Sequence, residues 1–299
     1  MSAGEGARSW ALERGDNLAV MRTMPAASVN LAYLDPPFCT GKDFGAFDDR
    51  WEWTTIPCHY DRLALPERTR DTIGFFDKQL GKSPELAWLV HIAERLIATR
   101  RVLRNSGVLV LHIDPRLEHC VRLLCDVALN GFTWQNTVIW RYRRWPAPAK
   151  RFQRMHDVLL VYAGEGSTFN ELHLDGVAQS TRETFGTRKQ KAIVKNGQRA
   201  TSTIDEETKG PPLADVWEVP IIAPSGNERK RGERYPTQKP EALLERVILS
   251  LSNPGDTVLD PYCGSGTSGA VCERLGRRWI GIDSGEVAER VTTERMELT

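Results

Sequence analysis

Short apolar runs alternate with longer amphipathic stretches along most of the chain. Continuous apolar runs are typical of strands buried on both faces of a sheet, and apolar residues three or four apart are typical of helices. Three runs end at an Asp-Pro pair, which stops a strand because proline has no N–H to donate. The pattern predicts strands at 9–14, 29–34, 108–113, 133–140, 157–162, 257–260 and 278–283, and helices at 17–24, 84–103, 115–130, 240–251 and 267–275.

This alternation of strand and helix predicts an α/β protein with a doubly wound, mostly parallel sheet. Residues 39–82 interrupt it with scattered glycines, prolines and aromatic residues, which predict an irregular lid, binding loop or insertion. Residues 163–215 are polar and weakly patterned. A chain of 299 residues has room for one large α/β domain with an insertion, or for two small domains.

The composition is that of an ordinary soluble protein, with 40% apolar residues, 26% charged residues and a net charge of +1. No run approaches the roughly 20 apolar residues of a membrane span, and the first residues lack the apolar core of a signal peptide. The six cysteines form no C-x-x-C pair, so we expect free thiols in a reducing cytoplasm and no metal site.

The sequence Asp35-Pro36-Pro37-Phe38 directly follows the apolar run at 29–34. Open α/β sheets bind ligands at the carboxyl ends of their strands, so this stretch is predicted to face a ligand. An Asp-Pro pair alone is more often a capped strand end. Here the second proline and the aromatic ring favour a functional site, because they place two hydrogen-bond acceptors and one stacking ring at a single point.

A second informative stretch runs from Asp260 to Gly269. Its glycines 264, 266 and 269 fit G-x-G-x-x-G between a strand and a helix, where a missing Cβ lets the backbone approach a ligand. Asp283 follows Gly264 by 19 residues, at the end of the next strand, where an acid can accept from both hydroxyls of a ribose. The stretch indicates a nucleoside-type cofactor; the alternative is a tight packing turn.

A nucleotide-binding dehydrogenase is a rival interpretation of these glycines. Only 30 residues follow Gly269, too few for the remaining strands of a dinucleotide-binding sheet, so those strands must come from earlier in the chain. The sheet is therefore expected to be built in permuted order. Asp260, at the end of the first strand, also suits a cationic ligand with an amino group and a sulfonium better than a pyrophosphate.

With these motifs in this order, the chain resembles the β-class DNA amino-methyltransferases, the adenine N6 and cytosine N4 DNA methylases, in which the catalytic motif precedes the cofactor motif. The resemblance covers nearly the whole chain. It is carried by residues 15–17, 35–38, 107–115, 235–240, 260–267 and 276–283, including Tyr235-Pro236-Thr237-Gln238-Lys239-Pro240 just upstream of the second motif.

The resemblance implies the Rossmann-like fold of S-adenosylmethionine-dependent methyltransferases, with permuted motif order, S-adenosylmethionine as cofactor and the exocyclic amine of a DNA base as acceptor. It implies a catalytic half at 1–162 with a loop insertion at about 39–82, a target-recognition region at 163–215 and a cofactor-binding half at 216–299. Residues 163–215 themselves match nothing in the family's pattern, so the DNA sequence that is read stays open.

The resemblance also implies roles for individual residues. Asp16 is expected to contact the cofactor adenine, Asp283 its ribose, and Thr237, Gln238 and Lys239 its methionine end. The expected catalytic residues are Asp35, Pro36, Pro37 and Phe38, and the remaining expected cofactor-binding residues are Asp260, Cys263, Gly264, Ser265, Gly266 and Thr267.

The chemistry can be argued from the catalytic residues. The exocyclic nitrogen of adenine or cytosine is a poor nucleophile because its lone pair is delocalised into the ring. The Asp35 carboxylate and the Pro36 carbonyl, both accepting from that amine, would localise the lone pair, and Phe38 would stack on the base. Because the amine is inaccessible within a duplex, the target base is expected to flip into the pocket.

A basic run at 141–154 contains no acid and interleaves cations with aromatic residues. Such runs are often only solvated faces. Between two strands of a methyltransferase, this one is predicted to grip phosphates or a displaced base of double-stranded DNA. The predicted DNA-binding residues are Arg141, Arg143, Arg144, Lys150, Arg151 and Arg154.

The leading hypothesis is an adenine N6-methyltransferase, because cytosine N4 enzymes of this family more often begin the catalytic motif with Ser. A cytosine N4 enzyme and a nucleotide-binding dehydrogenase are the alternatives. The sequence leaves open whether the protein forms a homodimer, and whether it has a cognate restriction endonuclease or is an orphan or phage enzyme.

Overall fold

The computed structural model of the chain describes residues 9–53, 64–145, 148, 150–173, 188–222 and 235–299. It divides into two compact units, one formed by Met1–Phe169 with Asp215–Thr299 and the other by Asn170–Ala214. Each unit is described by itself. Among the described residues, no helix is long and apolar enough to cross a membrane.

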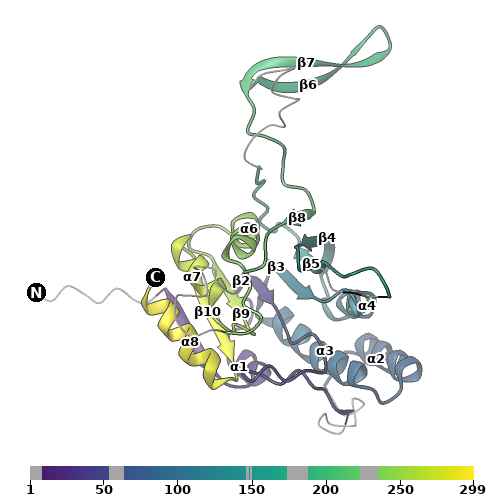
Figure 1. The fold of residues 1–299 in the computed structure, drawn as a ribbon, viewed down its shortest axis with the longest axis vertical. Helices are drawn as coiled ribbons and strands as arrows, with labels where there is room; N and C mark the ends of the chain where they lie inside the picture. The colour runs from purple at the N-terminus through teal and green to yellow at the C-terminus, as the bar shows by residue number, and fades with distance from the viewer. Residues whose placement is uncertain (1–8, 54–63, 146–147, 149, 174–187, 223–234) are drawn as a thin grey trace, which may run out of the picture. The chain divides into compact units, whose positions relative to one another are not determined.

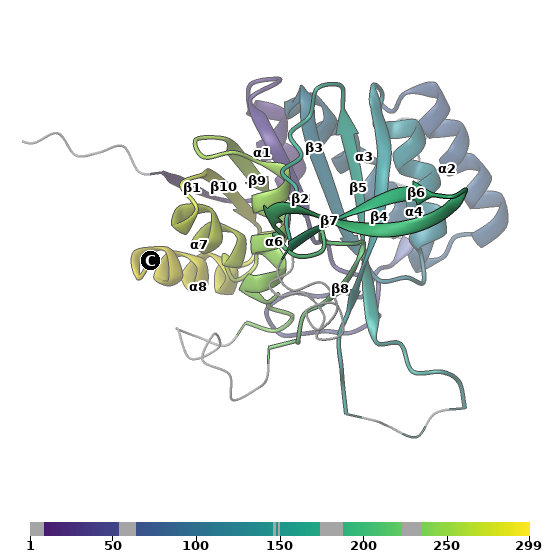
Figure 2. The ribbon, with the colours of Figure 1, turned by 90° about the horizontal axis from the view of Figure 1, so that it is seen from above.

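The larger unit is built on an eight-stranded sheet (Figures 1 and 2). Of these eight strands, only β5 runs against its neighbours. The predicted α/β class with a mostly parallel sheet is therefore confirmed. In sheet order the strands are β1 (Trp10–Arg14), β10 (Arg278–Asp283), β9 (Thr257–Asp260), β2 (Val29–Leu34), β3 (Leu103–Ile113), β5 (His156–Gly164), β4 (Phe132–Arg141) and β8 (Val216–Glu218).

Helices cover both faces of this sheet (Figure 2). One layer holds α1 (Asn17–Thr23), α3 (Pro84–Val102) and α4 (Glu118–Ala128), with α2 (Glu67–Leu80) packed against α3 and α4. The other layer holds α6 (Glu241–Leu251), α7 (Thr267–Arg274) and α8 (Glu286–Glu297). Because both faces are covered, the central strands are apolar throughout, as in β2, where only Asn30 is less than fully buried.

The direction in which successive strands are added to the sheet reverses between β9 and β2. These two strands are neighbours in the sheet although they lie far apart in the sequence. Leu31 pairs with Val258 and Ala32 with Leu259. From this point β3 continues the sheet on one side and β10 on the other. Ligands of doubly wound folds bind at such a switch point, outside the carboxyl ends of the strands. Asp35 and Asp260 stand at the ends of these two strands.

The prediction of irregular structure throughout 39–82 is wrong, because α2 lies within it. Pro66 and Gly81 were taken for loop residues, but they are the residues that flank the helix at its two ends. Ile73 and Phe76, three positions apart, are buried in the core shared with α3 and α4. Their burial outweighs the cost of Gly74 inside the helix, about 1 kcal/mol relative to alanine.

The strand predicted at 108–113 begins earlier, directly after the helix predicted at 84–103. α3 ends at Val102, and Leu103 already pairs with Val29 as the first residue of β3. The register then shifts, so that Leu31 pairs with Val108, and Asn105-Ser106-Gly107 lies in the irregular part of the strand instead of a turn. A Cβ at Gly107 would lie 2.9 Å from the Arg104 carbonyl oxygen, which explains glycine in this bulge.

The smaller unit contains a β-hairpin that the sequence analysis did not anticipate. Strands β6 (Arg188–Lys195) and β7 (Gln198–Glu207) pair antiparallel. Asn196 and Gly197 connect them, and both have positive φ, 55° and 76°. Asn-Gly flanked by alternating residues is the strongest short-range signal for a hairpin turn, so the pattern was present in the sequence and was overlooked.

Candidate active site

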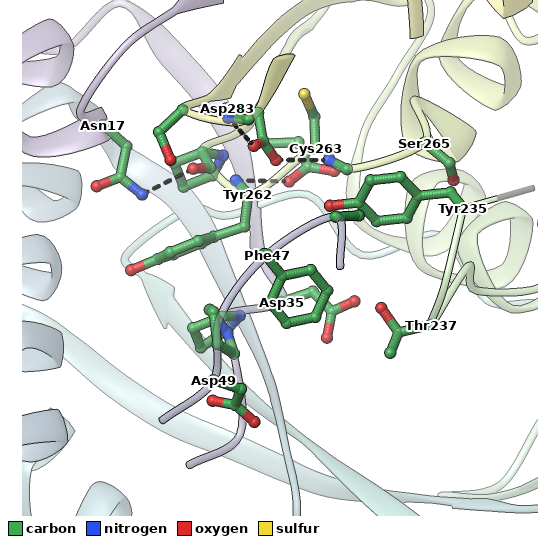
Figure 3. A pocket seen from close by; sticks show the side chains of 18 of the residues that line it. Asn17, Asp35, Phe47, Asp49, Tyr235, Thr237, Tyr262, Cys263, Ser265 and Asp283 are labelled. Carbon is green, nitrogen blue, oxygen red and sulfur yellow. Dashed lines mark hydrogen bonds between the residues drawn. The ribbon is translucent and has the colours of Figure 1, made fainter. Parts of the chain in front are cut away.

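A cavity of about 370 Å³ opens at the switch point (Figure 3). It is lined by the ends of β1, β2, β9 and β10, by the segment before α6 and by the loop after β2. All the predicted catalytic and cofactor-binding residues line it except Gly266, and none of the six predicted DNA-binding residues does. The structure thus brings residues 16, 35–38, 237–239, 260–267 and 283 to one place.

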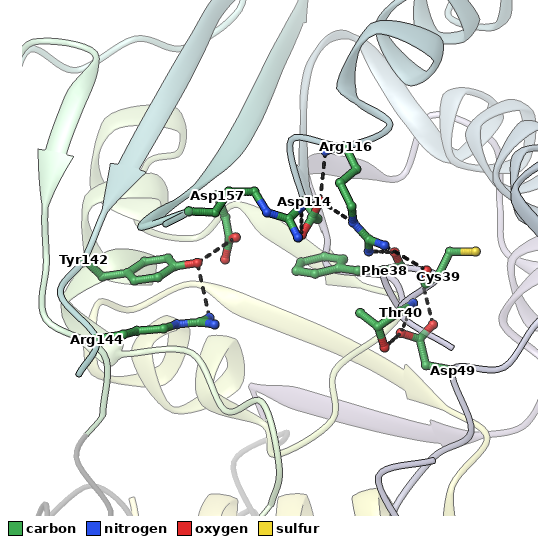
Figure 4. A network of polar contacts seen from close by, with 10 residues as sticks. Phe38, Cys39, Thr40, Asp49, Asp114, Arg116, Tyr142, Arg144 and Asp157 are labelled. Atoms are coloured by element: carbon green, nitrogen blue, oxygen red, sulfur yellow. Dashed lines mark hydrogen bonds and ion pairs between the residues drawn. The ribbon is translucent and has the colours of Figure 1, made fainter. Parts of the chain in front are cut away.

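The backbone of the Asp-Pro-Pro-Phe segment is held by two long-range donors. Trp88 Nε1 donates to the Pro37 carbonyl at 2.6 Å, and the Arg116 guanidinium donates to the Phe38 carbonyl at 2.9 Å (Figure 4). The Pro36 carbonyl accepts no hydrogen bond from the described residues. The carbonyls of Pro37 and Phe38 are therefore used for structure, and the Pro36 carbonyl is left for a ligand.

Asp35 forms an ion pair that the sequence did not predict. The Lys239 ammonium donates to Asp35 Oδ2 and lies 5.2 Å from the centre of the Phe38 ring. Both side chains are mostly buried, with exposed fractions of 11% for Lys239 and 17% for Asp35. Contact of Lys239 with the cofactor stays a prediction. Asp35 Oδ1 accepts no hydrogen bond from the described residues.

Asp49 fixes the loop that follows Phe38. It is buried and accepts from the Cys39 N–H at 2.9 Å, the Thr40 N–H at 2.8 Å, the Thr40 hydroxyl at 2.6 Å and Trp51 Nε1 at 3.0 Å. Four donors on one buried carboxylate fold residues 39–51 back over the cavity, so that Phe47 forms part of its wall.

The cofactor side of the cavity is acidic. Asp260 is buried, and its carboxylate accepts from Ser268 Oγ and from the Tyr262 N–H. Burial, together with the nearby Asp35 and Asp283, raises the pKa of Asp260 to about 7 despite these hydrogen bonds. Burial also raises the pKa of Asp283. Such a cluster favours a ligand that carries positive charge.

Asp283 joins two loops at the floor of the cavity. Its Oδ2 accepts from the Gly264 N–H at 2.9 Å and its Oδ1 from the Gly285 N–H at 2.8 Å (Figure 3). Each carboxylate oxygen can accept a further hydrogen bond, so a hydroxyl of a ligand can still be bound here.

The glycines after β9 have different reasons to be glycine. A Cβ at Gly264 would lie 3.0 Å from the Tyr235 ring at the cavity wall. A Cβ at Gly266, which has φ +68°, would lie 2.7 Å from Thr292 Cγ2 on α8, and one at Gly269 would lie 2.7 Å from Met296 Sδ. Gly266 does not line the cavity, and its contact with the cofactor stays a prediction. Close packing of α7 on α8 explains this glycine and Gly269.

Asp16 caps a helix and also lines the cavity, so its predicted contact with the cofactor adenine stays a prediction. Its Oδ1 caps α1 by accepting from the Ala19 N–H at 2.9 Å, and its Oδ2 accepts from Arg95 at 2.6 Å. The side chain is still 55% exposed and lines the cavity, so a ligand can reach it. Asn17, beside it, donates to the Pro261 carbonyl and links β1 to the loop after β9.

Several aromatic residues of the cavity wall were missed as site residues. Phe47 stacks on Tyr235 with ring centres 6.3 Å apart, and the Tyr262 hydroxyl lies 3.0 Å from His91 Nε2. Tyr235 and Tyr262 belong to motifs that carry the resemblance, which was the available signal. Phe47 offered none, because its place depends on the folding of its loop. Thr237, at φ +61°, adds a strained backbone position, which is typical of functional sites.

The basic run ends beside the carboxyl end of β3, where Arg154 pairs with Asp114 at 2.9 Å. Arg141 pairs with Glu218, and Arg144 lies 4.8 Å over the Tyr142 ring. Arg143, Lys150 and Arg151 are exposed and form no ion pair with the described residues. Trp145 and Phe152 are almost fully exposed. We call residues 141–154 the basic connector.

Comparison with known proteins decides between the two classes of enzyme considered above. A family model described as DNA methylase, covering N6 and N4 enzymes, matches residues 29–294. The chain belongs to this DNA methylase family. Membership excludes the nucleotide-binding dehydrogenase and confirms the family assignment made from the motifs.

One curated relative and two solved structures show how similar this DNA methylase is to known proteins. The DNA adenine methyltransferase YhdJ of Escherichia coli K12 is 28% identical over 289 residues, which are 95% of this chain and 81% of YhdJ. The M1.HpyAVI–SAM complex has a TM-score of 0.52 at 18% identity and covers 96% of this chain and 99% of its own. The cytosine-N4-specific PvuII DNA methyltransferase has a TM-score of 0.58 at 14% identity and covers 96% and 86%. The two solved structures confirm the predicted Rossmann-like methyltransferase fold.

Proposed function

We propose that this DNA methylase transfers the methyl group of S-adenosylmethionine to the N6 amine of adenine in double-stranded DNA. The observation that carries the proposal is the position of Asp35 and the Pro36 carbonyl beside the acidic end of β9, in one cavity at the switch point. The Asp-led motif and the adenine methyltransferase YhdJ support adenine over cytosine.

The acceptor side needs two hydrogen-bond acceptors for the two N–H bonds of the amine. Lys239 occupies Asp35 Oδ2, which leaves Oδ1 and the Pro36 carbonyl to accept from it. These bonds localise the nitrogen lone pair, and Phe38 holds the base by stacking. Holding two reactants in line supplies roughly 7–11 kcal/mol of the barrier. After transfer the nitrogen is strongly acidic, so Asp35 takes its proton without being an unusually strong base.

The residues on the cofactor side fit S-adenosylmethionine, which supplies an electrophilic methyl group when bound. Its sulfonium and ammonium charges match an acidic wall in which burial and like charges raise the pKa of Asp260 to about 7. Asp283 would hold the ribose and Asp16 the adenine, while Thr237, Gln238 and Lys239 would hold the methionine end. Cys263, Ser265 and Thr267 form the remaining wall of the cavity.

Cofactor binding is expected to depend on pH through Asp260. Below about pH 7 its carboxyl is protonated in the free protein, and a bound cation favours the carboxylate, so binding should tighten as pH rises through 7 and release about half a proton. Because the pKa of Asp260 is raised in the folded state, the folded protein binds more protons than the unfolded chain between about pH 4 and 7. The free energy of unfolding without cofactor should therefore fall as the pH rises from about 4 to 7. Calorimetry in buffers of different ionisation enthalpy measures the proton release.

The matched variant for this test is Asp260→Asn, which keeps the side-chain shape without the titration. Protons released by the cofactor's own amine are common to both proteins and cancel in the difference. Equal proton release by the wild type and Asp260→Asn at pH 7 would contradict the expectation.

Replacing Asp283 with alanine is expected to weaken S-adenosylmethionine binding by about 1–3 kcal/mol, or roughly 5- to 150-fold, for a lost charge-assisted pair to the ribose. Isothermal titration calorimetry measures it. Asp256→Ala is the control, since Asp256 also accepts a backbone N–H, that of Asn253, but lies outside the cavity. Unaltered cofactor affinity in Asp283→Ala would show that Asp283 only ties the two loops together.

We also propose that residues 163–215 carry target recognition and that the basic connector binds the DNA backbone. The separate unit Asn170–Ala214 supports the first assignment, and the connector cations that pair with no acid in the described part of the chain support the second. A homodimer and a cognate restriction endonuclease stay predictions from the resemblance. The cytoplasmic location stays a prediction from the cysteines.

The experiment that tests the proposed function is expression of the chain in a host free of DNA methylation, followed by sequencing that identifies modified bases by position. We expect N6-methyladenine at one sequence motif. N4-methylcytosine in its place would favour the alternative acceptor, and digestion of the DNA to nucleosides separates the two. Absence of both modifications would refute the proposal.

A further inference from the structure

A buried chain of polar side chains leads from the cavity towards the basic connector, and the mechanism above does not use it. His112 on β3 is fully buried. Its Nδ1 lies 2.8 Å from the Tyr33 hydroxyl and 3.8 Å from Asp35 Oδ1, and its Nε2 lies 3.6 Å from Asp157 Oδ2. Its ring also lies 5.7 Å from that of Phe38. One imidazole thus contacts the reacting segment on one side and a second carboxylate on the other.

The chain continues outwards from Asp157. The Tyr142 hydroxyl donates to Asp157 Oδ1 at 3.0 Å, and the Arg144 guanidinium donates to the Tyr142 hydroxyl at 3.2 Å (Figure 4). Tyr142 is buried, and its ring packs edge-on against Trp140. Arg144 belongs to the basic connector. The contacts therefore lead from Asp35 to a cation of the proposed DNA-binding segment. The outer two are hydrogen bonds, whereas the two contacts of His112 with carboxylates, at 3.8 and 3.6 Å, are too long for hydrogen bonds and are van der Waals and electrostatic contacts.

The charges of its neighbours determine how the imidazole is oriented. Burial acts to raise the pKa of Asp157, but contacts with His112, Lys239 and Tyr142 hold it below the usual value, so Asp157 is a carboxylate. Burial raises the pKa of Tyr33 well above the usual value, so Tyr33 is a phenol. Nε2–H of His112 is then assigned to face Asp157, and Nδ1 accepts from the Tyr33 hydroxyl.

We propose that His112 is a positioning residue for methyl transfer, which holds the Asp35 carboxylate in the rotation that accepts the target amine. Lys239 binds Oδ2 but leaves the carboxylate free to turn about that contact. His112, fixed between Tyr33 and Asp157, forms the wall beside Oδ1 and stops this turn. The inference rests on the proposed methyl transfer, but not on which base accepts the methyl group.

The test compares His112→Asn, Tyr142→Phe and the double variant. Asparagine keeps a polar atom near the position of Nδ1 and loses the contact with Asp157. Phenylalanine at position 142 removes one hydroxyl three contacts away from Asp35 and keeps the ring. We expect each single variant to lower kcat about tenfold or more, because small misplacements of a reacting group cost that much, with KM for DNA unchanged. The double variant should lose no more than His112→Asn, because both substitutions break one chain.

Tyr162→Phe is the matched control. Tyr162 is as buried as Tyr142 and donates to a carboxylate, Asp126, at 2.6 Å, but this pair joins β5 to α4 away from the cavity. It should leave kcat unchanged. Its melting temperature shows how much a lost buried hydroxyl costs the fold alone.

Two results overturn the inference. In the first, His112→Asn and Tyr142→Phe lower the melting temperature but keep wild-type kcat per folded molecule, which would make His112 an ordinary core histidine. In the second, the losses in kcat multiply in the double variant, so that the two residues act separately. Wild-type protein that methylates no DNA would refute the proposed function and this inference with it, whereas an active wild type with unaffected variants refutes the inference alone.

Discussion

Asp35→Ala is expected to lower kcat for methyl transfer by roughly 10²- to 10⁴-fold, the range that a positioned acid or base contributes. The variant removes the acceptor that faces the amine and receives its proton. Cofactor affinity should change little, because Asp35 lies on the acceptor side of the cavity. Single-turnover transfer of a labelled methyl group to cognate DNA measures the effect.

Two further variants separate chemistry from folding in this experiment. Removing Asp35 leaves the mostly buried Lys239 without its ion-pair partner, so some loss of stability is expected as well. Asp35→Asn keeps the side-chain shape and still loses the charge. Asp71→Asn, on the exposed side of α2, makes the same chemical change outside the cavity and should be as active as wild type. Near-normal turnover by Asp35→Asn would rule out Asp35 as the essential acceptor.

The basic connector gives the second large expected effect. Replacing Arg143, Lys150 and Arg151 together with alanine should weaken DNA binding on cognate and scrambled duplexes alike. Cations that meet phosphates release counterions, so log affinity falls with log salt by about 0.9 per phosphate. Loss of three contacts should flatten that slope by up to about 3 and lower affinity roughly a hundredfold or more at 0.1 M salt. These three residues are chosen because they have no ion pair among the described residues.

The control for the connector carries the same change of charge elsewhere. Arg68, Lys78 and Lys82 are exposed on or beside α2, away from the connector in the sequence, and their triple alanine variant should bind DNA as wild type does. An unchanged slope and affinity in the connector variant would show that the run is a solvated face. Loss on the cognate duplex alone would indicate contacts with base edges in place of phosphates.

The parts of the site that the sequence predicted are those with local signals. Asp35, Asp260 and Asp283 each end a strand that is apolar enough to recognise, and in a parallel sheet such strand ends meet at one edge. The pairing of Asp35 with Lys239 joins residues 204 positions apart and has no local signal. Asp49 is similar, because its four donors become visible only once the loop is folded.

Contacts between residues far apart in the sequence explain what the local pattern did not predict. Pro66 and Gly74 are typical of loops, which favoured irregular structure. Burial of Ile73 and Phe76 keeps α2 helical through Gly74, and Pro66 only precedes the helix. Gly266 and Gly269 were interpreted through a ligand, although the atoms that exclude a Cβ belong to α8, more than 20 residues later. A glycine pattern shows that something approaches closely, but it does not show what.

The two ends of the smaller unit lie next to each other. The Leu213 N–H donates to the Leu172 carbonyl at 2.7 Å, and His173 forms a bridge with Pro212. The hairpin can therefore change in length or sequence while the two ends of the smaller unit, which follow β5 and precede β8 in the chain, stay next to each other. On the proposal that residues 163–215 carry target recognition, exchange of this segment between related enzymes would change the DNA sequence that is methylated and leave the cavity unchanged.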